Sequence, residues 1–241
     1  FLRFLAFSGL VPLVGRALAR EPDYATARAR MLREIESDFR ATASDTGVSA
    51  PSPALRRALA AVPRERFVPP ALATDAYDNN PLPIGEGQTI SQPFIVALMT
   101  ELLKLPPGAR VLEVGTGSGY QAAVLAEMGM RVHSIEIVAP LAERARVALD
   151  AAGYAAVVTR IGDGYQGWPD AAPFDGIIVT AAPDHVPPAL VEQLKPGGRM
   201  VIPVGPNWLS QELRVIRKEP DGRTVTQRTL PVRFVPLTRA R

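Results

Sequence analysis

Three glycines at alternate positions mark the stretch whose residue types could bind a reactive small molecule. Gly115, Gly117 and Gly119 follow the apolar run Val111–Val114 and precede a helical pattern over about 118–128. Glycine allows a tight turn and lets a ligand approach the backbone, because no Cβ stands in the way. A helix that begins at such a turn favours a nucleotide-like ligand. The stretch therefore predicts a nucleotide-binding turn, with a purely structural turn as the alternative.

Two acidic residues follow the next two predicted strands. Glu136 ends a strand over 131–137 and lies about 20 residues beyond the turn, where an acidic residue meets ribose hydroxyls in folds of this type. Asp163, followed by Gly164, comes after a strand over 155–161. Ligands bind at the carboxyl ends of strands in open α/β sheets, although Asp-Gly is also a common turn dipeptide. Tyr120 stands where the dinucleotide fingerprint G-x-G-x-x-G has its third glycine, which argues against a nicotinamide cofactor.

Composition excludes several kinds of chemistry. The 241 residues include no cysteine and two histidines, His133 and His185, which are not at ligand spacing. We therefore expect no thiol catalysis, no metal site and no Ser-His-Asp triad. The net charge is +3 and there is no run of Lys and Arg, so we expect no nucleic-acid partner. An apolar fraction of 47% is enough for a sizeable core.

Strand and helix patterns alternate over the second half of the chain. Strands are expected over 131–137, 155–161, 174–180 and 200–204, helices over 140–152 and 186–194, and a closing hairpin over 212–218 and 224–234. Alternation of this kind predicts an α/β fold with a doubly wound, mainly parallel sheet, and the hairpin predicts an antiparallel C-terminal edge.

The first 105 residues have a different character. Residues 1–22 form a short apolar tract that is typical of a signal peptide or a membrane anchor, with a helix packed on the domain as the alternative. Residues 23–105 are expected to form an N-terminal helical cap, with helices over 23–40, 53–61 and 94–105, and residues 41–53 are expected to form a loop. Residues 106–241 then form the ligand-binding core, in one globular unit with the cap.

A long polar segment over 77–93 joins two of these helices. It contains Thr89 and Ser91 within Gly87-Gln88-Thr89-Ile90-Ser91-Gln92-Pro93. Loops of this length in compact domains are usually functional or mobile. We expect an active-site loop here, with a surface connection as the alternative.

Several segments resemble the protein-L-isoaspartate O-methyltransferase family of class I S-adenosylmethionine-dependent methyltransferases. The similarity runs from about residue 31 to residue 238. The matching motifs are Ala-Val-Pro-Arg-Glu at 61–65, Leu-Pro-Ile-Gly at 82–85, Gly-Gln-Thr-Ile-Ser-Gln-Pro at 87–93, Gly-Asp-Gly at 162–164 and Val-Arg-Phe-Val-Pro-Leu at 232–237. The resemblance implies a Rossmann-like methyltransferase sheet and a repair enzyme that methylates the α-carboxylate of L-isoaspartyl residues in damaged proteins and peptides.

The resemblance also implies roles for individual residues. Gly115, Gly117 and Gly119 would shape the S-adenosylmethionine turn, and Glu136 would bind the ribose hydroxyls. Asp163, with the backbone of Gly164, would contact the adenine. Ser91 matches the family's active-site serine, and Thr89 would shape its loop. An acceptor carboxylate is already ionised at neutral pH, so no general base is required.

Other functions are compatible with parts of this pattern. They are a methyltransferase for another carboxylate or small molecule, a nucleotide-binding oxidoreductase and a noncatalytic binding module. We expect a monomer. We also expect a cytoplasmic enzyme, because S-adenosylmethionine is made in the cytoplasm; export to the periplasm through residues 1–22 is the alternative.

Overall fold

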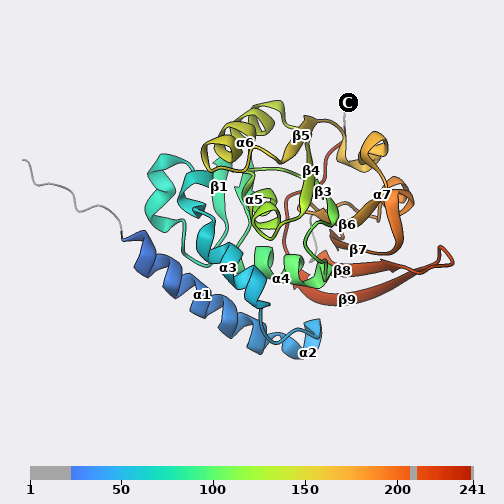
Figure 1. The fold of residues 1–241 in the computed structure, drawn as a ribbon, viewed down its shortest axis with the longest axis horizontal. Coiled ribbons are helices and arrows are strands. Elements are labelled where there is room, and N and C mark those ends of the chain that lie inside the picture. The colour runs from blue at the N-terminus through green and yellow to red at the C-terminus, as the bar shows by residue number, and fades with distance from the viewer. Residues whose placement is uncertain (1–22, 207–210, 240–241) are drawn as a thin grey trace, which may run out of the picture.

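A seven-stranded sheet forms the centre of the fold in a computed structural model that describes residues 23–206 and 211–239 (Figure 1). The spatial order is β5-β4-β3-β6-β7-β8-β9. The first five strands in this order are parallel, β8 is antiparallel to β7, and β9 is antiparallel to β8. The strands are β3 (Arg110–Val114), β4 (Arg131–Glu136), β5 (Val158–Ile161), β6 (Phe174–Val179), β7 (Leu194–Val204), β8 (Gln211–Lys218) and β9 (Thr224–Val232). This is the predicted Rossmann-like architecture with an antiparallel C-terminal edge.

Strand order reverses at β3, and this reversal positions the site. From β3 the chain moves outward through β4 to β5, and it then returns to place β6 on the other side of β3. The connecting helices leave a crevice above the carboxyl ends of such strands, and ligands bind in it. The glycine-rich turn after β3 lies at this point of the sheet.

Apolar side chains alternate between the two faces of the central strands. Val111, Ile178 and Val201 belong to a core cluster on one face, and their chain neighbours Leu112, Ile177 and Met200 belong to a second cluster on the other face. Successive residues of a strand point to opposite faces, so strands buried on both sides need continuous apolar runs. These runs explain why the central strands are recognisable in the sequence.

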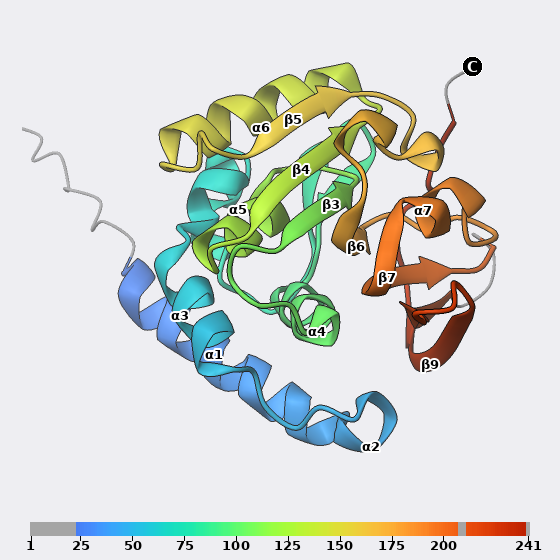
Figure 2. The same cartoon turned by 45° about the vertical axis from the view of Figure 1, so that its right-hand side comes forward.

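Helices cover both faces of the sheet. They are α1 (Tyr24–Ala41), α2 (Ala43–Thr46), α3 (Pro53–Ala61), α4 (Pro93–Leu103), α5 (Tyr120–Glu127), α6 (Ala139–Ala151) and α7 (Pro188–Gln193). Helices α1 and α3 lie at the side of the molecule away from α7 (Figures 1 and 2). Within the described residues, no helix is long and apolar enough to cross a membrane. The expected signal peptide or anchor over 1–22 lies outside the described residues.

Three local predictions were wrong. Residues 41–53 contain the short helix α2, and residues 77–93 contain a hairpin of β1 (Leu82–Gly85) and β2 (Gln88–Ile90). The fifth parallel strand, β7, begins at Leu194 and includes the Pro-Gly-Gly that we expected to separate a helix from a strand at Met200. Leu194 pairs with Phe174 and Arg199 with Gly176, so this segment forms a bulge between two residues that are paired with β6, and tertiary context overrides the local turn preference.

Candidate active site

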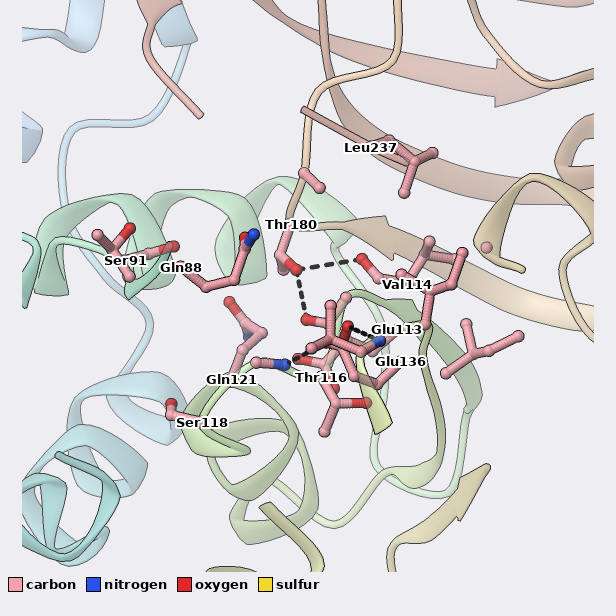
Figure 3. Close-up of a pocket in the computed structure, with 18 of the residues that line it drawn as sticks. Gln88, Ser91, Glu113, Val114, Thr116, Ser118, Gln121, Glu136, Thr180 and Leu237 are labelled. Carbon is pink, nitrogen blue, oxygen red and sulfur yellow. Dashed lines mark hydrogen bonds between the residues drawn. The ribbon is translucent and has the colours of Figure 1, made fainter. Parts of the chain in front are cut away.

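A cavity lies above the carboxyl ends of β3, β4 and β6 (Figure 3). Six separate parts of the chain form its wall. They are residues 88–91 with Val96, residues 113–121 without Gly119, residues 135–138, Gly164, residues 180–181, and residues 236–238. The glycine turn, Glu136, Thr89 and Ser91 therefore meet in one space, although Thr89 and Glu136 are 47 positions apart in sequence.

The glycine turn has backbone conformations that favour glycine. Gly115 and Gly119 have φ values of 98° and 89°. A Cβ on Gly115 would lie 2.5 Å from Oγ1 of Thr180, whose hydroxyl donates to the Gly115 carbonyl at 2.6 Å. Gly119 does not line the cavity; it precedes the first residue of α5 and donates its N–H to the Thr116 carbonyl at 2.8 Å. The Thr180 hydroxyl and a hydrogen bond within the turn thus help to fix its backbone.

Glu136 lies at the end of β4 with its carboxylate in the cavity wall. Its Oε2 accepts the N–H of Gly117 at 2.8 Å, and its Oε1 accepts the N–H of Val138 at 3.0 Å. Each carboxylate oxygen can accept a further hydrogen bond. The side chain therefore holds the glycine turn in place and keeps acceptor capacity for hydroxyl groups of a ligand.

Gly164 and Asp163 differ in their relation to the cavity. A Cβ on Gly164 would lie 2.4 Å from Cγ1 of Val114 and 3.3 Å from Cδ1 of Leu237, so any other residue at this position would collide with the Val114 side chain. Asp163 is not among the lining residues, and its Oδ1 accepts the N–H of Tyr165 at 2.9 Å. The geometry therefore places Gly164 in the wall, and Asp163 directly behind it.

Ser91 and Thr89 lie where this cavity meets a second one. The second cavity, of about 430 Å³, is lined by Thr89, Ser91 and Thr180 together with Pro81, Gln92, Ile95 and residues 231–235. In Figure 3 the side chains of Ser91 and Gln88 lie across the cavity from Glu136. Ser91 is thus exposed to two compartments, one beside the glycine turn and one open toward the C-terminal segment.

The C-terminal segment closes the wall between the two cavities. The N–H of Ala182 donates to the Val235 carbonyl at 2.8 Å, and the N–H of Leu237 donates to the Ala182 carbonyl at 2.8 Å. The side-chain amide of buried Gln211 also makes two hydrogen bonds with the backbone of Phe234, at 2.6 and 3.0 Å. Four hydrogen bonds therefore fix residues 234–237 beside the cavities.

Sequence reasoning assigned no role to several lining residues. Glu113 is fully buried below the turn, and its Oε2 accepts the Ser134 hydroxyl, which is 2.6 Å from the Thr116 hydroxyl. Burial is the main cause that raises the pKa of Glu113 to about 8. A charged residue inside an otherwise apolar strand was the available signal. Thr180 was missed too, although its position just after β6 is where ligand-binding residues are found.

The cavity fits S-adenosylmethionine on the evidence of its own residues. Gly115 and Gly164 stand where any Cβ would collide with the wall, so the backbone itself forms the surface that a flat base or a sugar can approach. Glu136 lines the same cavity, and its carboxylate can accept hydrogen bonds from hydroxyl groups. The doubly wound sheet and this site define a Rossmann-like, S-adenosylmethionine-dependent methyltransferase.

Comparison with known proteins gives the family. Residues 41–241 match the model of the protein-L-isoaspartate(D-aspartate) O-methyltransferase family, and the chain belongs to this family. It is 56% identical over 224 residues to protein-L-isoaspartate O-methyltransferase 2 of Syntrophobacter fumaroxidans, covering 93% of this chain and 91% of that protein. It is therefore an enzyme of this type, with S-adenosylmethionine as methyl donor.

Two solved structures share the fold. A protein-L-isoaspartate O-methyltransferase matches with a TM-score of 0.74 and 30% identity, covering 87% of this chain and 65% of the other. A structure from Plasmodium falciparum, described as a protein-L-isoaspartate O-methyltransferase in complex with S-adenosyl-L-homocysteine, matches with a TM-score of 0.73 and 23% identity, covering 90% of this chain and 98% of the other. The predicted family, fold class and cofactor are confirmed.

Proposed function

We propose that the enzyme repairs damaged proteins and peptides by methylating the α-carboxylate of L-isoaspartyl residues at the junction of the two cavities. The observation that carries this proposal is the position of Ser91 and Thr89, which line both the cofactor cavity and the second cavity. The second cavity, which residues 231–235 also line, is the space that would receive the peptide. A methyltransferase for another carboxylate or a small molecule is the alternative.

The cofactor side of the site holds its ligand through backbone and carboxylate groups. When bound, S-adenosylmethionine supplies a methyl group on a positively charged sulfur. Gly115 and Gly117 let the backbone approach the ligand, with Gly119 ending the turn before α5. Glu136 accepts hydrogen bonds from the ribose hydroxyls, and Asp163 with Gly164 supports the adenine.

The acceptor side orients an anion that needs no activation by a base. A peptide α-carboxyl group has a pKa of about 3.3–3.7, so it is ionised at neutral pH. The Ser91 hydroxyl donates a hydrogen bond to one carboxylate oxygen and leaves the other directed at the methyl group. Thr89 shapes the same edge of the hairpin. Orienting two bound reactants can contribute roughly 7–11 kcal/mol to a reaction of this kind.

Two synthetic peptides test the substrate class. They are identical except for one L-isoaspartyl or one L-aspartyl residue, and both are offered with labelled S-adenosylmethionine. We expect base-labile label on the isoaspartyl peptide alone. If neither peptide is labelled although the cofactor binds, the enzyme methylates another acceptor.

The Ser91→Ala variant tests the role of the hydroxyl. A hydrogen bond to a charged group contributes about 1.5–3 kcal/mol, so we expect kcat to fall about 10- to 100-fold with an unchanged cofactor Kd. Ser52→Ala is the matched control, because Ser52 caps α3 and lies outside both cavities. Loss of cofactor binding in Ser91→Ala would show that the assigned role is wrong.

We also propose that the enzyme acts as a monomer in the cytoplasm. The compartment follows from the cofactor, which is made there. Gel filtration and cell fractionation test the two statements, and a periplasmic enzyme would support export through residues 1–22.

A further inference from the structure

Arg64 is a buried cation beside residues 77–91, which contain the β1–β2 hairpin and Ser91 and are called the acceptor loop below. The mechanism above gives Arg64 no role. It begins the short 3-10 helix Arg64–Phe67, between the N-terminal cap and the hairpin. Its side chain is fully buried, with 0% exposure. An arginine is almost never fully buried unless its charge is paired, so its surroundings require an explanation.

The guanidinium of Arg64 binds both ends of the acceptor loop. Its Nε donates to the carbonyl of Ala76 at 2.7 Å, and its Nη2 donates to the carbonyl of Ser91 at 2.7 Å. These two carbonyls flank residues 77–90, which contain the β1–β2 hairpin. One rigid, planar group therefore joins the beginning of the loop to Ser91, the residue whose hydroxyl is proposed to orient the acceptor carboxylate.

The same guanidinium also contacts the cofactor side. Its Cζ lies 4.7 Å from the centre of the Tyr120 ring. Tyr120 is the first residue of α5, directly after the glycine turn, and it lines the cofactor cavity. Arg64 thus lies between the acceptor loop and the helix that follows the cofactor turn.

The charge of Arg64 has no carboxylate partner. Among the described residues, no Asp or Glu oxygen lies within 4.0 Å of its guanidinium nitrogens. Burial lowers the pKa of Arg64 to about 10, so the group stays protonated at neutral pH. Burying a charge among neutral groups has a high desolvation free energy, and an apolar side chain of similar size would not have this cost. The contacts with Ser91 and Tyr120 indicate a positional role instead.

We infer that Arg64 is a positioning residue that fixes the Ser91 backbone, and through it the Ser91 hydroxyl, relative to the cofactor turn. Holding the Ser91 carbonyl fixes the peptide plane between Ser91 and Gln92, and with it the direction of the serine side chain. The inference rests on the proposed role of Ser91. Lysine cannot replace this group, because a single ammonium lacks the planar fork that reaches two carbonyls and stacks on a ring.

A double-mutant cycle with Arg64→Lys and Ser91→Ala tests the inference. Displacing a catalytic group by about 1 Å can cost about 100-fold in rate, so we expect Arg64→Lys to lower kcat about 10- to 100-fold when Ser91 is present. In the Ser91→Ala background the same change should have almost no effect on kcat, because the group that Arg64 positions is gone. The cofactor Kd should stay unchanged in all four proteins.

Arg28→Lys is the matched control for the cycle. Arg28 also donates to a backbone carbonyl, that of Ala60 at 2.8 Å, and lies 5.1 Å from the ring centre of Tyr77. It belongs to the same cap but makes no hydrogen bond to Ser91. Its effect should be the same with and without the Ser91 hydroxyl.

Two outcomes would overturn the inference, and they are distinguishable from each other. If Ser91→Ala lowers kcat but the effect of Arg64→Lys is the same in both backgrounds, Arg64 does not act through Ser91. If Ser91→Ala itself leaves kcat unchanged, the proposed role of Ser91 fails first. Rates are expressed per cofactor-binding site, so that unfolded molecules are not counted, and Arg64→Gln repeats the cycle with a neutral side chain.

Discussion

The cofactor side and the acceptor side of this site meet at Ser91 and Thr180 but are built in different ways. The largest contiguous part of the cofactor side is residues 113–121 without Gly119, which contain the glycine turn and follow directly on β3. The acceptor side is assembled from a hairpin, a residue after β6 and the C-terminal segment over 231–235. The hairpin and the C-terminal segment lie more than 140 residues apart in sequence, with Thr180 between them.

This difference has a physical cause. The cofactor turn is held by a central sheet that is buried on both faces, so its geometry follows from strand and glycine preferences. The acceptor side is held by individual long-range hydrogen bonds, such as those of Arg64 and Gln211. We therefore expect changes in the cofactor turn to have larger effects than changes at the margin of the acceptor side.

Gly115→Ala should have the largest effect. The new Cβ would lie 2.5 Å from Oγ1 of Thr180 at a φ of 98°, so the turn must move. A displacement of about 1 Å costs about 100-fold in rate, and we expect a loss of turnover of this size with weakened cofactor binding. Gly153→Ala is the control, because Gly153 has a φ of 92° but no atom within 4 Å of the built Cβ. Equal turnover in the two variants would contradict the importance of the clash.

Glu136→Ala should weaken cofactor binding to a smaller extent. Loss of one ribose hydrogen bond to the carboxylate costs about 1.5–3 kcal/mol, so we expect the cofactor Kd to rise about 10- to 100-fold by calorimetry. Glu101→Ala is the control, since Glu101 also accepts a backbone N–H, that of Ser52 at 2.9 Å, but lies on α4 outside both cavities. An unchanged Kd in Glu136→Ala would refute ribose binding.

Glu113→Gln tests whether the buried carboxyl group of Glu113, below the cofactor turn, is protonated in the native state. Burial raises the pKa of Glu113 from 4.5 to about 8, so between these pH values the native state keeps a proton that the unfolded state has released. The unfolded state then binds fewer protons, and stability falls as pH rises, by up to about 1.4 kcal/mol per pH unit from this group. Glutamine stays neutral and removes this contribution.

Urea unfolding at pH 5, 6, 7 and 8 measures the difference between the two proteins. We expect the free energy of unfolding of Glu113→Gln, relative to the natural chain, to increase with pH over this range. A difference that is constant with pH would show that Glu113 is ionised in the native state.

Arg144→Ala should have the smallest effect. Arg144 on α6 pairs with Glu86 at the tip of the hairpin, at 3.5 Å, and both side chains are about half exposed. Exposed ion pairs contribute about 0.2–1 kcal/mol, so thermal stability should change little and turnover should be kept. Arg146→Ala, which removes pairs within α6 alone, is the control. A large loss of turnover in Arg144→Ala alone would show that the hairpin tip takes part in catalysis.

The difference between the cofactor side and the acceptor side also determined which elements could be predicted from the sequence. The strands of the central sheet other than β7, and the helices over 53–61 and 139–151, were predicted within a few residues, because continuous apolar runs and helical spacing are local signals. The β1–β2 hairpin was missed, because its strands are three or four residues long and three positive φ values occur in a row at Gly85, Glu86 and Gly87. The extension of β7 through Pro-Gly-Gly depends on pairing with β6, which no local pattern contains.

The sequence by itself determined the glycine turn, the acid at the end of the next strand and the family motifs around Ser91, because each depends on residue type and spacing along one stretch. Only the tertiary structure decided that Ser91 lies between two cavities, that Arg64 holds its carbonyl, and that Leu237 faces Gly164. Contacts of this kind join residues that are far apart in the chain. They exist only when the sheet and its connections bring those residues together.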